Sequence, residues 1–433
     1  MSYYSDATKR FLLATKHAEI ESLRQLAGNC KLVTQVTSMI HHLQRERGIS
    51  NVYIVSAGMR FKQQKARQQQ MSIDAEALLT SQLRAQYLSA ENHGANSRLL
   101  GCITLGLQGL DSLSHLREQV AMLNLSALES TQAYSRLVNG LLAVVFEAAD
   151  VASDPAITRL LVALFNFSQS KEFAGQERAW GAMGFANSHF DRALCERLEQ
   201  LQADQAHSID IFLAFCDEDI ARLWHDTEAD KVTGQVQQLR GMIKQLADGT
   251  EIDDQLSEIW YDVATTRIDA MLRVEEALTS RLLSLAGKQV ANAQADLTNH
   301  ERLLNSLDKH PPATDSPFSI LFDPRVPGLR GSDSHSDDQS FNPAEAITAH
   351  RSFYDLLCDQ SDRINKITEE LEQARQAITE HKTIDRAKLL LMQQWGLSET
   401  QAYRRLQQSA MESNTRIANI ARKVVDSVAN RAG

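Results

Sequence analysis

Cysteine is scarce in this 433-residue sequence, and the cysteines lie far apart. None of the five falls in a CxxC spacing; they are Cys30, Cys102, Cys195, Cys216 and Cys358. Disulfide frameworks and structural zinc sites both need matched sets of cysteine or histidine. We therefore expect reduced thiols in a protein core, with neither a disulfide scaffold nor a metal site.

Long apolar runs are also missing. The longest spans residues 141–146, far short of the roughly 20 apolar residues that cross a membrane as a helix. The first ten residues, MSYYSDATKR, lack the apolar segment of a secretory signal. These absences predict a cytoplasmic protein that makes no contact with a membrane.

An excess of basic charge is absent from the chain as a whole but present at its C-terminal end. The net charge of −10 argues against a chain that coats nucleic acid without specificity. From residue 384 to residue 433, eight basic residues face four acidic ones, a net charge of +4 that leaves −14 for the rest. This end of the chain is the part suited to nucleic acid.

Proline is nearly absent before residue 310, where only Pro155 occurs. Six more follow in a stretch that also holds the polar run SDSHSDDQS; they are Pro311, Pro312, Pro317, Pro324, Pro327 and Pro343. Because proline blocks helix interiors, we predict a linker at residues 309–343. Pro155, directly after a capping Asp154, instead predicts the start of a helix.

The remaining sequence has helical periodicity. Apolar residues recur at spacings of three and four, and Ala, Leu, Gln and Glu are abundant. We predict an all-α protein in which residues 1–308 form one large up-and-down helical bundle.

Heptads occupy residues 344–382. Their seam consists of Phe353, Leu357, Gln360, Ile364, Ile367, Leu371, Ala374 and Ile378. A strict 3.5-residue period predicts a left-handed coiled coil, so we expect a homodimer through this helix or through the bundle. The alternative is an amphipathic helix that packs on its own domain.

Residues 383–433 divide into three short amphipathic helices. Gly396 ends the first, Ser398 and Gln401 form a capping-box pattern for the second, and Asn414 can cap the third. The tail is thus a small three-helix module.

Two arginines lie where core residues are expected. The stripe through Leu43 continues to Arg47, beside Gly48 and Ser50, and a second stripe after Pro155 carries Lys171, Gly175 and Arg178; the first stripe begins with Leu32, Val36 and Met39 or Ile40. A buried guanidinium keeps its charge and needs an anion, and its planar fork suits nitrate, nitrite or a carboxylate. The alternatives are pairing with the adjacent Glu46 or Glu177, or snorkelling at a helix rim.

Patterns of catalysis are missing. His41 and His42 are adjacent, so they point about 100° apart on a helix and cannot chelate one metal as partners four residues apart can. We find no phosphate-binding glycine loop, no nucleophile elbow and no haem or cluster ligands. We expect neither an enzyme nor a cofactor.

Three segments resemble the nitrate- and nitrite-sensing (NIT) domain. They are RERGIS around Arg47, KEFAGQERAWG from Lys171 to Gly181, and the stretch from Trp260 to Leu278, and the resemblance covers about residues 35–285. It implies that nitrate or nitrite binds at two arginines and their small neighbours, with a third arginine as a further candidate. The residues concerned are Arg47, Gly48, Ser50, Gly175, Arg178 and Arg267.

The C-terminal module resembles the ANTAR domain, the RNA-binding module of transcription antiterminators. The resemblance implies contact with leader mRNA stem-loops through Arg386, Lys388, Arg404, Arg405 and Arg422. The family-pattern residues Ala387, Ala402, Tyr403 and Ala410 are interpreted as packing. Trp395 departs from the family pattern, and two interpretations are open: it stacks on a loop base or it fills the core.

Together the two resemblances imply a nitrate- or nitrite-responsive positive regulator that prevents transcription termination in a nitrate assimilation operon. In this hypothesis the anion bridges the helices that carry Arg47 and Arg178, and the coiled coil transmits the change to the ANTAR module. The alternative is a small-anion-responsive DNA-binding regulator of the helix-turn-helix type.

Overall fold

The computed structural model describes residues 6–88, 96–186, 189–246, 255–309, 353–397, 399–413 and 415–432. Throughout these ranges the regular structure is α-helical, as predicted, and no strand occurs. The helices within them are α1 (Asp6–Val55), α2 (Lys62–Tyr87), α3 (Ser97–Asp111), α4 (Leu113–Ala121), α5 (Ala127–Asp150), α6 (Pro155–Ala186), α7 (Arg192–Phe215), α8 (Glu218–Glu228), α9 (Lys231–Leu246), α10 (Gln255–Lys309), α11 (Phe353–Trp395), α12 (Glu399–Glu412) and α13 (Ile417–Ala432).

The chain forms two compact units. The first comprises Met1–Leu26 and Ala286–Gln373, and the second comprises Ala27–Leu285 and Ala374–Gly433. In the first unit one face of each long helix is buried, through Leu12, Lys16 and Ile20 of α1 and Ala293 of α10. None of the described helices is long and apolar enough to cross a membrane.

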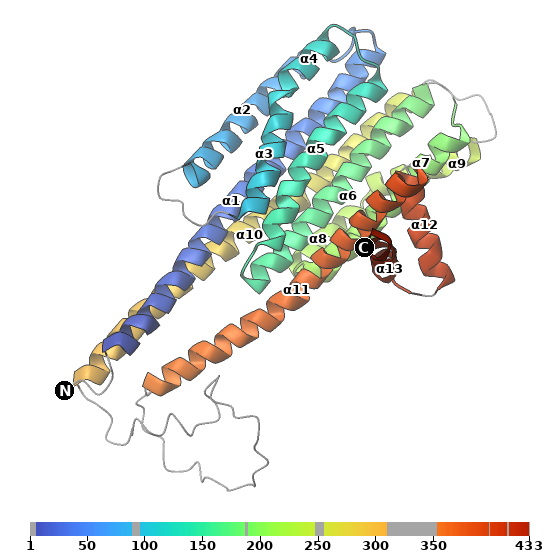
Figure 1. The fold of residues 1–433 in the computed structure, drawn as a ribbon. Helices are drawn as coiled ribbons and strands as arrows, with labels where there is room; N and C mark the ends of the chain where they lie inside the picture. The colour runs from blue at the N-terminus through green and yellow to red at the C-terminus, as the bar shows by residue number, and fades with distance from the viewer. Residues whose placement is uncertain are drawn as a thin grey trace. The chain divides into compact units, whose positions relative to one another are not determined.

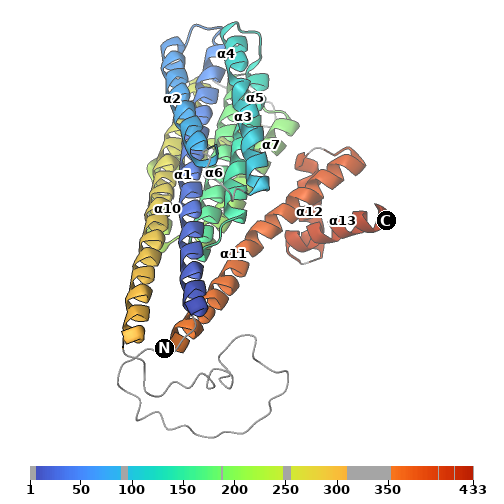
Figure 2. The ribbon, with the colours of Figure 1, turned by 60° about the vertical axis from the view of Figure 1, so that its left-hand side comes forward.

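Helix α6 is the central helix of the second unit. Figures 1 and 2 show it running alongside α1, α5 and α10, and it also packs along α7. Residues 160–168 of α6 are all buried, so this part of the helix has no solvent face. The helix begins at Pro155 as predicted, because Asp154 Oδ1 accepts a hydrogen bond from the Ile157 amide at 2.9 Å.

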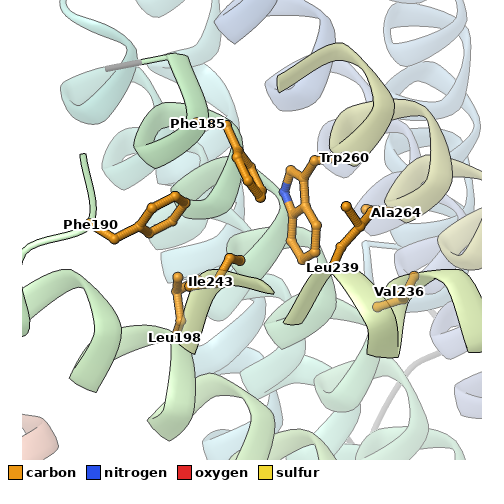
Figure 3. Packing of buried hydrophobic residues seen from close by; sticks show 8 residues of the cluster. All are labelled: Phe185, Phe190, Leu198, Val236, Leu239, Ile243, Trp260 and Ala264. Carbon is orange, nitrogen blue, oxygen red and sulfur yellow. The ribbon is translucent and has the colours of Figure 1, made fainter. Parts of the chain in front are cut away.

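An aromatic cluster fixes the end of α6 against α10. Phe185, Phe190 and Trp260 pack together with Leu198 of α7 and with residues of α9 (Figure 3). A Cβ at Gly181 would lie 2.5 Å from the Trp260 indole, so only glycine admits the ring here. The Trp260 indole N–H donates to the Arg178 carbonyl at 2.9 Å, which ties this cluster to one of the two stripe arginines.

The end of α11 forms a three-helix module with α12 and α13. Its core contains Ala387, Ala402 and Ala410, which confirms their interpretation as packing residues, together with Leu391, Leu406, Ile420 and Ala421. Gly396 adopts a φ of 63° directly after α11, the left-handed conformation of a helix end that was predicted. The predicted caps Ser398 and Asn414 lie outside the described residues.

Helix α11 runs without a break through the predicted heptads. Ile378 is buried within the single chain, and the next turn contacts α5 and α6 through His381, Phe146 and Phe165. This end of the helix therefore packs on its own chain, in agreement with the alternative to a coiled coil. The predicted linker and the seam side chains from Phe353 to Ile364 lie outside the described residues, so the coiled coil stays a prediction.

Candidate anion site and nucleic-acid interface

Both stripe arginines are buried. Arg47 of α1 is 0% exposed and Arg178 of α6 is 4% exposed. The apolar members of the first stripe, Leu32, Val36, Met39, Ile40 and Leu43, are buried as predicted. A close approach of α1 and α6 thus places two permanent positive charges inside the bundle.

Arg47 is neutralised by a carboxylate from α6. Its Nη1 and Nη2 donate to Glu172 Oε1 at 2.5 Å and Oε2 at 3.1 Å, and Nη1 also donates to Ser135 Oγ at 2.7 Å. Glu172 accepts two further bonds, from Gln44 Nε2 at 3.0 Å and Gln176 Nε2 at 2.9 Å. The Arg47 Nε–H has no acceptor among the described residues.

Arg178 has no such partner. It donates to Thr265 Oγ1 at 2.9 Å and to the Gln44 carbonyl at 3.4 Å, and its guanidinium lies 5.0 Å from the centre of the Tyr261 ring. No carboxylate of the described residues forms an ion pair with it. Burial lowers the pKa of Arg178, and the positive charge of Arg47 lowers it further. This guanidinium is therefore the buried charge that an external anion would stabilise.

The two acids that directly precede the arginines in sequence pair elsewhere. Glu46 binds Arg117 through bonds of 2.8 and 2.9 Å, and Glu177 binds Arg240 through bonds of 2.7 and 2.6 Å. The alternative predicted from their position, pairing with Arg47 or Arg178, is therefore wrong. Glu172 was not anticipated from the sequence.

Two glycines allow the arginines to approach the opposite helix. A Cβ at Gly48 would lie 2.4 Å from Arg178 Nη2, and a Cβ at Gly175 would lie 2.5 Å from Arg47 Nη2. The Arg178 guanidinium of α6 thus lies against Gly48 of α1, and the Arg47 guanidinium of α1 lies against Gly175 of α6. This geometry confirms the expectation that the small residues beside the arginines permit close approach.

A cavity of about 330 Å³ adjoins both arginines and both glycines. Its polar wall includes Asn51 and Thr131, which are joined by a hydrogen bond of 2.7 Å. At its solvent side the half-exposed pair Arg60–Glu258 links the turn after α1 to α10 through a bond of 2.6 Å. The cavity has room for a small anion with water molecules beside it.

Two predicted residues lie outside the cavity lining. Ser50 is buried on α1, and Arg267 is buried on α10 with its guanidinium bonded to Glu228 at 2.9 Å and Gln205 at 3.2 Å. The structure thus brings Arg47, Gly48, Gly175 and Arg178 together at one cavity and directs Arg267 to a separate ion pair.

The basic residues of the C-terminal module differ in accessibility. Arg386, Arg405 and Arg422 are exposed, whereas Lys388 pairs with Asp385 at 2.8 Å and Arg404 of α12 pairs with Glu196 of α7 at 3.2 Å. Of the five predicted contact residues, three arginines are therefore open to a polyanion, and the other two are engaged by carboxylates.

Trp395 is 50% exposed, which disfavours the interpretation that it fills the core. The Arg405 guanidinium carbon lies 3.5 Å from the centre of the Trp395 ring. A stacked guanidinium covers one ring face and adds positive charge to it. The pair forms a flat, charged surface feature of the module.

The described part of the chain offers no cluster of metal ligands and no disulfide. No group of three or more His, Cys, Asp or Glu residues there could hold a metal ion. Cys30, Cys102, Cys195 and Cys216 are free thiols, and burial raises the pKa of Cys30 to about 12, which keeps that thiol protonated.

Residues 38–283 match the family described as nitrate and nitrite sensing (NIT). The chain belongs to the NIT family. Its NIT domain contains Arg47, Arg178 and the whole cavity between them, and residues 372–425 match the ANTAR domain.

The similarity to individual proteins extends beyond the NIT domain. The chain is 28% identical over 407 residues to a nitrate regulatory protein of Klebsiella oxytoca, covering 94% of this chain and 91% of that protein. Among solved structures it resembles the NasR transcription antiterminator, with a TM-score of 0.59 and 25% identity over 98% of both chains.

Proposed function

We propose that this protein is a nitrate- or nitrite-responsive positive regulator, which binds stem-loops of a leader mRNA and prevents transcription termination in a nitrate assimilation operon. The NIT and ANTAR matches support this role, as does the near full-length similarity to a nitrate regulatory protein and to the NasR antiterminator. The role is regulatory rather than catalytic, with the anion as ligand and no cofactor. We expect the protein to act in the cytoplasm as a homodimer.

The observation that carries the ligand assignment is the unmatched guanidinium of Arg178 beside the Arg47–Glu172 pair. A planar anion between the two arginines would accept charge-assisted hydrogen bonds from Arg178 and from the Arg47 Nε–H. Each such bond contributes about 1.5–3 kcal/mol. Two of them can supply much of the free energy that separates two conformational states.

Binding at this point would act on the packing of three helices. Arg47 belongs to α1, Arg178 to α6, and the Thr265 and Tyr261 contacts belong to α10. An anion that bridges both arginines supplies the missing negative charge, offsets their mutual repulsion and favours a closer arrangement of α1 and α6. Helix α7 packs along α6, so a shift of α6 reaches the Glu196 carboxylate that holds Arg404. We expect RNA and Glu196 to compete for Arg404.

On the RNA side, the exposed arginines Arg386, Arg405 and Arg422 are assigned to phosphate contacts. Trp395 with its stacked Arg405 is assigned to an unpaired loop base, because sequence-tolerant stacking on aromatic rings is the usual way to hold splayed RNA bases.

Calorimetry with potassium nitrate tests the anion site. We expect binding to the full chain and loss of at least 100-fold in affinity for Arg178→Ala, since charge-assisted bonds are lost. Arg222→Ala, which removes an exposed helical arginine, is the matched control. Unchanged binding by Arg178→Ala and by Arg47→Ala would exclude this cavity.

Gel-shift assays with leader hairpins and with promoter duplex test the nucleic-acid target. We expect preference for the hairpins, an effect of nitrate on their affinity, and a loss of about tenfold for Trp395→Ala that Trp395→Phe largely restores. Tighter binding to the duplex would favour the DNA-binding alternative.

A further inference from the structure

Glu172 occupies the anion site as a fixed internal counter-ion. It is almost wholly buried on α6, and its two oxygens accept four hydrogen bonds, from Arg47 Nη1 and Nη2, Gln44 and Gln176. All four groups are donors, as an ionised carboxylate requires, and together they fill its acceptor capacity. The carboxylate is therefore held as a permanent part of the site.

The surrounding buried charges are already matched among themselves. Lys171 pairs with Glu275, which also accepts from Ser168, while Glu46 and Glu177 pair with Arg117 and Arg240. Each of these pairs brings one positive and one negative charge. None of them changes the charge balance next to the cavity.

Three charged groups remain at the meeting point of α1 and α6: Arg47, Arg178 and Glu172. Two positive charges and one negative charge give a net charge of +1, which a single monovalent anion neutralises. Two acids of α10 lie nearby without an ion pair to Arg178: Asp269 acts on it from a distance, and Asp262 lines the cavity. Asp262 is exposed and Asp269 is partly exposed, so solvent screens their effect.

We propose that Glu172 sets the valence selectivity of this anion site, so that the site accepts monovalent oxyanions and rejects divalent ones such as sulfate. The inference rests on the proposed binding of nitrate between Arg47 and Arg178. A divalent anion would leave an uncompensated negative charge in a buried site, which is costly. Size alone would not exclude sulfate, because the adjoining cavity measures about 330 Å³.

Two substitutions raise the charge of the cluster by one unit through different routes. Glu172→Gln keeps the shape of the side chain and removes its charge. Gln176→Lys keeps Glu172 and its bonds to Arg47, and places an ammonium where the Gln176 amide now donates to Glu172. The second variant also decides the question if the first does not fold, because its buried pair stays intact. Glu147→Gln, a buried acid of α5 that pairs with Arg98, is the control.

The measurement is calorimetric titration of the full chain with potassium nitrate and with potassium sulfate, after circular dichroism has verified the fold. We expect the ratio of sulfate to nitrate affinity to rise about tenfold or more in both charge variants and to stay unchanged in Glu147→Gln. A wild-type ratio in a folded Gln176→Lys variant, or in a folded Glu172→Gln variant, overturns the valence role while leaving nitrate binding by the wild type untouched. Wild-type protein that binds no nitrate would instead remove the proposed site and this inference with it.

Discussion

The interior of the bundle and the C-terminal module use arginine in opposite ways. In the bundle, Arg47 and Arg178 are buried and close together; Arg47 pairs with Glu172, whereas Arg178 has no carboxylate partner among the described residues. In the module, Arg386, Arg405 and Arg422 are exposed. A buried arginine selects a ligand by geometry and charge balance, because an unmatched charge there is expensive. An exposed arginine attracts any polyanion, and its effect fades with salt.

The largest expected effect is on stability, and it should differ between the two buried arginines. Arg47→Gln leaves Glu172 without its bidentate partner, so we expect the free energy of unfolding of the bundle to fall by about 3–5 kcal/mol. Arg178→Gln removes a charge that has no carboxylate partner, so we expect a change of less than about 1 kcal/mol in either direction. Urea denaturation followed by circular dichroism in nitrate-free buffer measures both. Equal losses in the two variants would contradict the asymmetry.

Salt sharpens the comparison between the two regions. If the three exposed arginines neutralise RNA phosphates, leader affinity should fall by about 20- to 40-fold between 50 and 200 mM potassium glutamate. Arg422→Ala should reduce the slope of log affinity against log salt by about one. Nitrate affinity, measured by calorimetry in the same buffers, should change by less than about twofold, since the buried site is poorly screened. A steep salt dependence of nitrate binding would mean that its arginines are accessible to solvent.

The sequence alone was sufficient to place the arginines but insufficient to find their counter-ion. Periodicity on α1 placed Arg47 on a buried stripe, because one side of that helix is uniformly apolar. The stripe on α6 passed through Gly175 and Arg178 and missed Glu172. An apolar stripe shows which residues of a helix are buried only if the helix also has a face toward solvent. Helix α6 is buried on nearly all sides, so polar residues on any of its faces can lie in the core.

The rotation of α10 about its axis explains why Arg267, a predicted anion ligand, does not line the cavity. Arg267 falls in a segment that resembles the NIT domain, yet it lies outside the cavity lining. At 100° per residue it projects about 200° away from Thr265, the α10 residue that contacts Arg178. Which face of α10 meets α6 depends on the packing of Trp260 against Gly181, a contact between residues 79 positions apart. A single sequence taken by itself gives no measure of such a long-range register.

A smaller effect on nitrate affinity is expected from replacing the glycines that let each arginine lie close to the backbone of the opposite helix. Gly175→Ala introduces a Cβ that would lie 2.5 Å from Arg47 Nη2, so the guanidinium must move. We expect nitrate affinity to fall by about tenfold, while the free energy of unfolding changes by less than about 1 kcal/mol because alanine also favours the helix. Calorimetry and urea denaturation measure the two quantities. Gly140→Ala in α5, where a Cβ meets nothing within 4 Å, should leave nitrate affinity unchanged. Similar losses in both variants would show that the effect is not specific to the arginines.

The smallest expected effect is the pH dependence of stability that arises from His41, a buried histidine of the bundle. Burial lowers the pKa of His41 to about 2, and the positive charges of Lys171, Arg45 and Arg178 act in the same direction. The native state therefore keeps this histidine neutral, while the unfolded chain takes up a proton below a pH of about 6.5. Stability is fully present above that pH and should fall by about 1.4 kcal/mol for each further pH unit downward.

His41→Gln should remove this part of the slope between pH 6.5 and 5.5, as measured by urea denaturation at each pH. His115→Gln, which changes an exposed histidine of α4, should retain the slope. Because the effect arises in the bundle, the pH dependence of RNA affinity should be the same in wild type and in His41→Gln. An identical slope of stability in wild type and His41→Gln would mean that His41 is hydrated in solution and that the interior around Lys171 and Arg178 is wetter than its packing indicates.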